Sequence, residues 1–424
     1  MPQQSVYFFG DGSAEGTKEM KAILGGKGAN LAEMTNLGVP VPPGFTIACP
    51  LCITYLRERR TPESLPTEID AALRRLERVT GKGFGDAGNP LLVSVRSGSP
   101  VSMPGMMETI LNLGLNDDTV AGLARASGNP RFAYDSYRRF IQMYGDVVLG
   151  VPSGHFERLL GTKRLTAGVK TDADLDEAAL RALVDEYKAL VRAHATSEFP
   201  MDPTIQLWGA IEAVWRSWML KKAVDYRRVN GISEDLGTAV NSVSMVYGNL
   251  GDDSGTGVSF TRNPSTGEKK FYGEFLINAQ GEDVVSGSRT PLSIDEMANL
   301  LPGAYADLLA TERRLEAHFR DMQDLEFTVE RGKLYLLQTR TGKRTAAAAV
   351  RVATDMVDEG LITCNTAVQR VAPEQLAHLL HPVIEADVRA TPLCSGLPAS
   401  PGAASGLAVF DLTSPSSALR AASK

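Results

Sequence analysis

The chain has 424 residues, of which 43% are hydrophobic and 22% are charged, as in soluble globular proteins rather than disordered ones. This length allows about three domains. The formal net charge of −6 argues against a nucleic-acid-binding protein, because such proteins carry a basic surface. No apolar run approaches the ~18 residues that cross a bilayer, and residues 1–10 lack the pattern of a signal peptide. We therefore expect no contact with a membrane.

The cysteines point to a reducing compartment. Four of them in 424 residues are few, so we expect the chain in the cytoplasm. Cys49 and Cys52 form a CxxC pair, which fits a redox pair or half of a zinc site, and equally fits two small apolar residues at a helix start. Because no second pair accompanies them, the sequence favours the helix start.

Strand and helix patterns alternate over the first 115 residues. Apolar runs predict strands at residues 5–9, 45–49 and 91–95, and apolar spacing predicts a helix over 66–80. The stretch AILGGKGANLAEMTNLG predicts a strand end, a glycine turn and then a helix from Ala29 to about Asn36. A helical-looking segment follows Gly105.

The pattern changes after residue 115. Apolar residues at i, i+3, i+4 and i+7 predict a helical insertion, and the tryptophan-rich stretch 204–228 predicts one more helix. Strands and turns follow from about 236, then helices over 292–320, a hairpin over 324–340 and two or three helices over 343–390. We expect an α/β lobe (1–115 with 203–245), a helical lobe (116–202), a β-rich lobe (246–342) and a helical linker (343–392).

The first candidate for chemistry is Gly25-Gly26-Lys27-Gly28, placed before the predicted helix. Exposed N–H groups there could face a phosphate, with Lys27 as a point charge. The stretch is not a Walker A loop, because no Ser or Thr follows the lysine. A tight turn with a solvated lysine is the alternative.

The second candidate is Arg96 with the uncharged loop that follows it, SGSPVSMPGMM. An arginine at a strand end can bind phosphate oxygens with its fork of N–H groups, and a loop with Gly98 and Gly105 can approach a polyphosphate closely. The alternative is an ordinary β-to-α connection with Arg96 in a surface ion pair.

The third candidate is the pair Asp324 and Glu326. Strand side chains alternate, so both carboxylates share one face, as a Mg²⁺ site or a solvated surface would require. We predict a three-residue hairpin loop, Glu330 to Gly332, which places Gln338 opposite Asp324 and Leu336 opposite Glu326. Arg340 would then point the same way, whereas a two-residue loop would turn Gln338 to the other face.

A fourth set of polar residues lies in the stretch YGEFLINAQGEDVVSG. It comprises Glu274, Gln280, Glu282 and Asp283. Such a cluster is typical both of nucleotide contacts and of turn chemistry, and the sequence does not separate the two.

Seven segments together resemble the pyruvate, phosphate dikinase family, in order and nearly without gaps. They are LGGKGANLAEMTNLGVPVPPGFTI, LLVSVRSGSPVSMPGMMETILNLGLND, GNPRFAYDSYRRFIQMY, SGTGVSFTRNPSTGE, LINAQGEDVVSG, HFRDMQDLEFTVE and LYLLQTRTGKR. The phosphoenolpyruvate synthases share GGKGAN but carry a different loop after the Arg-Ser pair, so they match less well.

The resemblance implies an ATP-grasp-like nucleotide-binding domain with three lobes of α/β and α+β structure. It implies a phosphotransferase that binds Mg²⁺, ATP and phosphate, with a monovalent cation and a homodimer left open. In the family the β-phosphoryl of ATP passes to a histidine on a swivelling domain, and the γ-phosphoryl passes to phosphate. AMP and pyrophosphate remain, and the histidine then phosphorylates pyruvate in a C-terminal barrel.

The resemblance also implies roles for single residues. Lys27 and Arg96 resemble the phosphate-contacting cations, and we expect them to be catalytic together with Arg340. Asp324, Glu326 and Gln338 resemble the metal and nucleotide ligands. Further nucleotide contacts are expected at Gly98, Ser102, Met103, Gly105 and Glu282. The segment from Ser97 to Thr109 resembles a loop that closes over the phosphates, so Arg96 would stabilise the transferring phosphoryl group while water is excluded.

The resemblance changes near the other end of the sequence. GLPASPGAASGLAVFD resembles the first strand of the swivelling domain, but the family's Thr-Ser-His-Ala context and pyruvate barrel have no counterpart in this sequence. We expect 393–424 to be an incomplete start of that domain, disordered or loosely attached from about 411, because one strand cannot bury a face alone. The acceptor histidine would then be supplied in trans.

Two other functions stay open at this point. One is a nucleotide-binding module without turnover, either truncated or regulatory. The other is a phosphoenolpyruvate synthase relative, which would show no dependence on phosphate.

Overall fold

The computed structural model describes residues 4–285 and 289–379. Two compact units divide the chain: Met1–Thr261 with Phe271–Thr341, and Arg262–Lys270 with Gly342–Lys424. Helices and two antiparallel sheets make up the first unit, so the expected mixed α/β class is confirmed. The lobe boundaries that we predict within residues 1–342 remain predictions. Within the described ranges, no helix combines the length and apolar character that crossing a membrane needs.

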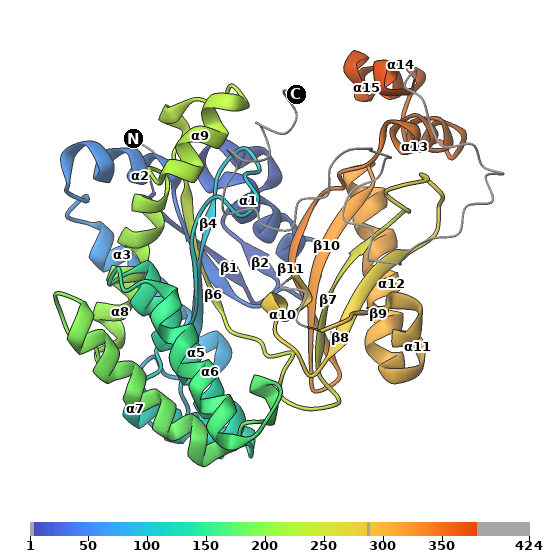
Figure 1. Cartoon of the computed structure of the whole chain (residues 1–424). Coiled ribbons are helices and arrows are strands. Elements are labelled where there is room, and N and C mark those ends of the chain that lie inside the picture. Colours follow the sequence, from blue (N-terminus) through green and yellow to red (C-terminus); the bar gives the residue numbers. More distant parts are fainter. Residues whose placement is uncertain (1–3, 286–288, 380–424) are drawn as a thin grey trace, which may run out of the picture. The chain divides into compact units, whose positions relative to one another are not determined.

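The first sheet has six antiparallel strands in the order β2-β1-β3-β6-β4-β5. Their bounds are Ser13–Ala14, Val6–Gly10, Gly44–Ile47, Ala239–Ser244, Val93–Gly98 and Thr109–Leu113. Figure 1 labels β1, β2, β4 and β6 of this sheet. The expectation of a helical segment after Gly105 is wrong, because Thr109–Leu113 form strand β5, which pairs with β4. Fully buried Val95 and Ile110 lie opposite each other, so apolar packing holds this segment as a strand.

Helix α1, Lys21–Asn36, replaces the strand end and turn that we expected before Ala29. The helix is interrupted at Gly25, whose φ of 67° and ψ of 171° are not helical. The single helix expected over 204–228 is also wrong. It is two helices, α8 (Pro203–Ser217) and α9 (Lys221–Val229), because Leu220 adopts an extended conformation between them.

Four helices form the helical segment expected between 116 and 202: α4 (Asp117–Ser127), α5 (Pro130–Val147), α6 (Ser153–Ala167) and α7 (Glu177–His194). Polar side chains begin several of them: Asn116 caps α4, Asn129 caps α5 and Asp176 caps α7, each by accepting backbone N–H bonds. The remaining α-helices among the described residues of the first unit are α2 (Cys49–Glu58), α3 (Leu65–Thr80), α10 (Gly281–Val285), α11 (Met297–Leu300) and α12 (Pro302–Phe319).

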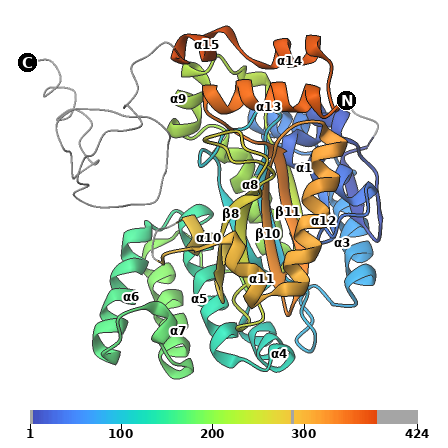
Figure 2. The ribbon, with the colours of Figure 1, turned by 90° about the vertical axis from the view of Figure 1, so that its right-hand side faces the viewer.

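The second sheet has five antiparallel strands in the order β11-β10-β7-β8-β9. Their bounds are Lys333–Thr341, Gln323–Glu330, Gly255–Phe260, Tyr272–Ile277 and Leu292–Ser293. Helix α12 packs against β10 and β11, and α11 packs against α12 (Figure 2). Leu325 and Phe327 of β10 pack there with Leu308 and Leu315 of α12, which makes this face a closed apolar core.

The β10–β11 hairpin corrects the predicted loop. Glu330 pairs with Lys333, so the loop has two residues, Arg331 and Gly332, both at positive φ. Two successive residues at positive φ give the turn whose twist matches that of the flanking strands, and this favours the shorter loop.

A bulge in β11 nevertheless leaves Gln338 on the expected face. The register shifts between Glu326 and Phe327, so Phe327 lies opposite Leu336 and Glu326 lies opposite Gln338. The extra residue, Leu337, reverses the faces that the shorter loop would have given. Asp324 lies opposite Arg340 rather than Gln338, and all four polar side chains share one face.

The second unit contains three of the helices expected over 343–390: α13 (Ala346–Asp358), α14 (Cys364–Arg370) and α15 (Pro373–Leu379). Buried Arg262 donates two hydrogen bonds to the Glu359 carboxylate, at 3.0 and 2.7 Å, and so fastens the short segment 262–270 to the end of α13. Our expectations for 380–392 and 393–424 lie outside the described residues.

Gly25 gives the first testable prediction. A Cβ at this position would lie 1.6 Å from the Gly98 carbonyl oxygen, at a backbone conformation open only to glycine. Gly25→Ala should therefore lower the free energy of unfolding by about 2 kcal/mol or more, measured by urea denaturation.

Gly26→Ala is the matched control. A Cβ there would lie 3.5 Å from the nearest atom, which is ordinary contact, and alanine favours a helix over glycine by about 1 kcal/mol. Equal stability of the two variants would contradict the close packing of α1 on β4.

Candidate functional site

A cavity of about 420 Å³ lies between the two sheets of the first unit. One side is formed by α1, β4, β5 and β6, and the other by β7, α10 and the β10–β11 hairpin. Its volume lies in the range of small-molecule sites. Of the residues predicted from sequence, it brings together Lys27, Arg96, Gly105 and Glu326.

The glycines around Lys27 allow close packing, and the N–H of Gly26 is engaged within the protein. The Gly26 N–H donates to the Ser99 carbonyl at 2.9 Å, so the expectation that it is available to a phosphate is wrong. A Cβ at Gly98 would lie 3.4 Å from the Cβ of Lys27, which shows how closely α1 approaches the end of β4. This approach brings the Lys27 side chain to the cavity.

The Lys27 ammonium group has a pKa well below that of an ordinary lysine. The pKa of Lys27 is lowered to about 7. Burial is the largest cause, the charges of Arg96 and Arg340 also lower the pKa, and the charge of Glu326 raises it. Among the described residues its ammonium group has no hydrogen bond or ion pair. A desolvated amine beside two guanidinium groups is a place where an anion would bind.

Arg96 lies in β4 and also lacks an acidic partner within the described ranges. Its Nε is buried without a hydrogen-bond acceptor, so the alternative of a surface ion pair is wrong. A buried N–H without an acceptor is costly, and an oxygen-rich ligand in the cavity would relieve that cost.

The loop after Arg96 contributes one cavity residue, Gly105. Gly98 ends β4 beneath α1, Ser102 is exposed and Met103 is 6% exposed in the main core, and none of the three lines the cavity. The Glu108 carboxylate binds Lys222 at 2.7 Å and its N–H donates to Ser217, so the end of the loop is fastened to the α8–α9 corner.

The polar face of the hairpin lies across from these cations. The Glu326 carboxylate lines the cavity and has no ion pair in the described part of the chain. Asp324 is 6% exposed and accepts from Arg340 Nε at 2.7 Å. Arg340 and Gln338 share the face but do not line the cavity.

The donor set on this face fits a hard cation. Asp324, Glu326 and Gln338 offer carboxylate and amide oxygens, which are the ligands that Mg²⁺ prefers. No group of three or more His, Cys, Asp or Glu residues that could hold a metal occurs in 4–285 or 289–379. A cation here would therefore need Gln338 and oxygens of a bound ligand as well.

Several residues that line the cavity were not among the predicted site residues. Ser94 and Thr328 line the cavity because they lie two residues from Arg96 and Glu326 on the same strand faces, which strand alternation could have predicted. Gln280 lines it from the fourth polar set, and the Gln280 N–H donates to Asp283 at 2.9 Å. Glu282 lies in α10, and its side chain is outside what the structure describes.

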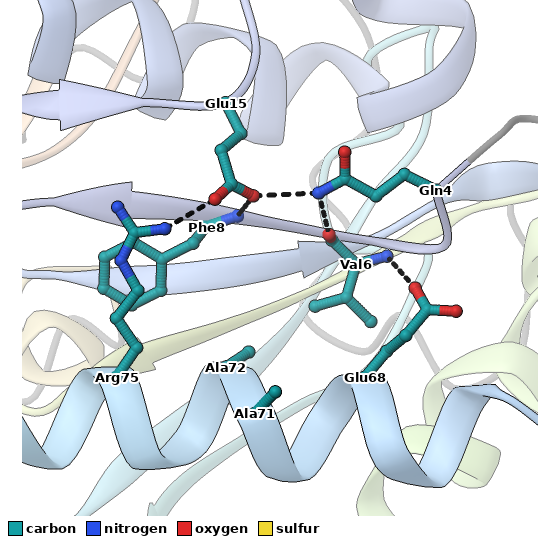
Figure 3. A pocket seen from close by; sticks show the side chains of 8 residues that line it. All are labelled: Gln4, Val6, Phe8, Glu15, Glu68, Ala71, Ala72 and Arg75. Carbon is teal, nitrogen blue, oxygen red and sulfur yellow. Dashed lines mark hydrogen bonds and ion pairs between the residues drawn. The ribbon is translucent and has the colours of Figure 1, made fainter.

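A second cavity, of about 390 Å³, lies beside β1 and α3 (Figure 3). Arg75 stacks on the Phe8 ring at 4.0 Å and binds Glu15 at 2.5 Å, while Gln4 donates to Glu15 at 2.9 Å. Glu68 accepts from the backbone of Ser5 at 2.9 Å. Since these charged groups already have partners, this cavity lacks the unpaired cations of the first one.

The CxxC pair matches the helix-start interpretation. Both cysteines are buried in the first turn of α2, and burial raises the pKa of each thiol to about 12. Neither is a reactive thiolate near neutral pH.

The family model and the relatives that this chain matches agree with one another. A family model described as "Pyruvate phosphate dikinase, AMP/ATP-binding domain" matches residues 21–62, 56–301 and 296–361. The chain is 53% identical over 418 residues to a pyruvate, phosphate dikinase of Rhizobium meliloti (strain 1021). It is 54% identical over 409 residues to that of Clostridium symbiosum, and 53% over 411 residues to a chloroplastic one of Arabidopsis thaliana.

These matches cover 96% of this chain and 46%, 46% and 43% of the three relatives, so the chain spans slightly less than half their length. The family model covers most of the chain. The chain therefore belongs to the family of the pyruvate phosphate dikinase AMP/ATP-binding domain.

Proposed function

We propose that this chain binds MgATP in the 420 Å³ cavity and is the ATP-binding half of a pyruvate, phosphate dikinase. The observation that carries the proposal is the convergence of two cations without acidic partners, Lys27 and Arg96, on a cavity that Glu326 faces. The family description, which names AMP and ATP, supports the same ligand.

The phosphates of ATP match the cationic side of the cavity. The Arg96 guanidinium would donate its unpaired Nε–H to a phosphate oxygen, and Lys27 would add a point charge. The loop that contributes Gly105 would close over the phosphates and exclude water, which strengthens both interactions.

Magnesium would bind on the opposite side. Asp324, Glu326 and Gln338 would hold it, and the ion would neutralise phosphate charge when bound. Arg340 would keep the Asp324 carboxylate in place through the bond it already donates. Lys27 and Arg96 on one side and the cation-binding carboxylates on the other would thus position the triphosphate, and positioning with electrostatic stabilisation dominates catalysis of phosphoryl transfer.

The reaction of the whole relatives needs more than this cavity. We propose that the β-phosphoryl of ATP passes to a histidine on a separate domain and the γ-phosphoryl passes to phosphate, leaving AMP and pyrophosphate. The second candidate function is a module that binds the nucleotide without turnover. A phosphoenolpyruvate synthase type of reaction is the third candidate, and it would not depend on phosphate.

The first test is calorimetric titration of the chain with MgATP. Arg96→Ala removes a charge-assisted contact and should cost at least ~1.5 kcal/mol, about tenfold in affinity. Glu326→Gln should weaken MgATP but change the affinity for metal-free ATP little, because its carboxylate would act through the ion.

Arg75→Ala is the control, since this arginine is bound to Glu15 in the other cavity and should not affect MgATP affinity. Absence of MgATP binding by the unaltered chain would refute the proposed site. Equal losses in all three variants would point to damaged folding instead.

The second test concerns the proton on Lys27. With its pKa at about 7, the amine is mostly neutral at pH 8, and the bound triphosphate should raise the pKa again. Binding at pH 8 should therefore take up nearly one proton, and binding at pH 6 almost none. Calorimetry in two buffers of different ionisation enthalpy measures this uptake, which Lys27→Met should abolish. Identical binding enthalpies in both buffers at pH 8 would contradict it.

The third test asks for turnover. A histidine-bearing domain from one of the relatives would be mixed with this chain, phosphate and ATP labelled in the β-phosphoryl group. We expect the label on the added domain together with AMP formation. Label that appears equally without phosphate would favour the synthase type, and no label despite tight MgATP binding would favour the module without turnover.

A further inference from the structure

One fully buried polar side chain lies directly beneath the two cations of the proposed site. Asn241 is 0% exposed, in the central strand β6, between β3 and β4. It pairs with Thr46 on one side and with Arg96 on the other. Side chains of residues directly opposite each other in antiparallel strands point to the same face of the sheet. The side chains of Asn241 and Arg96 therefore both point to the face that α1 covers.

Two glycines make room for this side chain. A Cβ at Gly28 of α1 would lie 2.8 Å from Asn241 Oδ1, and a Cβ at Gly98 of β4 would lie 2.5 Å from Asn241 Nδ2. The carboxamide thus fills the space that these glycines leave between the helix and the strand. One of the two glycines follows Lys27 directly, and the other lies two residues after Arg96.

Both ends of the carboxamide have partners. The Thr46 hydroxyl donates to Asn241 Oδ1 at 2.9 Å, and Asn241 Nδ2 donates to the Arg96 carbonyl at 3.5 Å. Only a side chain with one acceptor and one donor of this size satisfies both contacts. An apolar residue of similar shape would leave the Thr46 hydroxyl without this acceptor.

We propose that Asn241 is a positioning residue, whose carboxamide sets the separation of α1 from β4 so that Lys27 and Arg96 converge on the same phosphate groups. This rests on the proposed binding of MgATP. Asn241 does not line the cavity, so its effect on affinity must pass through the two cations.

The experiment is a double-mutant cycle on MgATP affinity. Asn241→Ala is measured in the unaltered chain and in the Lys27→Met, Arg96→Ala background, with urea denaturation of each variant. We expect a loss of about tenfold in the unaltered chain and less than about twofold in the background that lacks both cations. Ser242→Ala is the control, because Ser242 is equally buried in β6 but faces the other side of the sheet.

A second variant keeps the test informative if Asn241→Ala does not fold. Thr46→Val preserves the shape of the neighbour and removes only its hydrogen bond to Asn241, and it should show the same dependence on the two cations. Equal losses with and without the cations would overturn the positioning role while leaving MgATP binding intact. Absence of binding by the unaltered chain would instead overturn the proposed function.

Discussion

The candidate site depends on how closely helix α1 approaches the end of strand β4. The approach is possible because Gly25 adopts a backbone conformation that other residues avoid and carries no Cβ to meet the Gly98 carbonyl. The same helix reaches the second sheet, where the Asn30 amide donates to the Thr339 carbonyl at 2.7 Å. Leu31 and Met34 of α1 also pack in the core of that sheet. One helix therefore fixes both walls of the cavity relative to each other.

This arrangement has an electrostatic cost. It holds Lys27 near Arg96 and Arg340, and partial burial together with these two charges lowers the pKa of Lys27. The free energy of unfolding would be higher if these charges lay apart, but a site that already holds its cations in place does not need to reorganise when an anion arrives. Placement of unfavourable charges before the ligand binds is typical of sites that act through preorganised electrostatics.

Much of this site could be predicted from sequence, and the failures have physical reasons. Local patterns made Lys27, Arg96 and Glu326 candidates, since each stands at a motif or on an alternating strand, and the resemblance to the family favoured a functional role for them. The β10–β11 hairpin could not be predicted in full. The predicted loop length was wrong, and Gln338 lies on the predicted face of the sheet only because of the bulge at Leu337. Neither the bulge nor the pairing of β5 with β4 is encoded by neighbours in sequence, since both depend on packing against distant residues. The hydrogen bond from the Gly26 N–H to the Ser99 carbonyl also joins residues that are distant in sequence, so local patterns do not predict it.

The order of strands in the first sheet has a consequence for folding. Strands β3 and β4 both lie against β6, yet β6 begins at Ala239, more than a hundred residues after β4 ends at Gly98. During synthesis, the inner edges of β3 and β4 stay unpaired until the ribosome has released the whole helical segment. Unpaired edges and long loop closures slow folding and favour association with other chains. Nascent chains that still lack β6, which ends at Ser244, therefore expose the unpaired edges of β3 and β4.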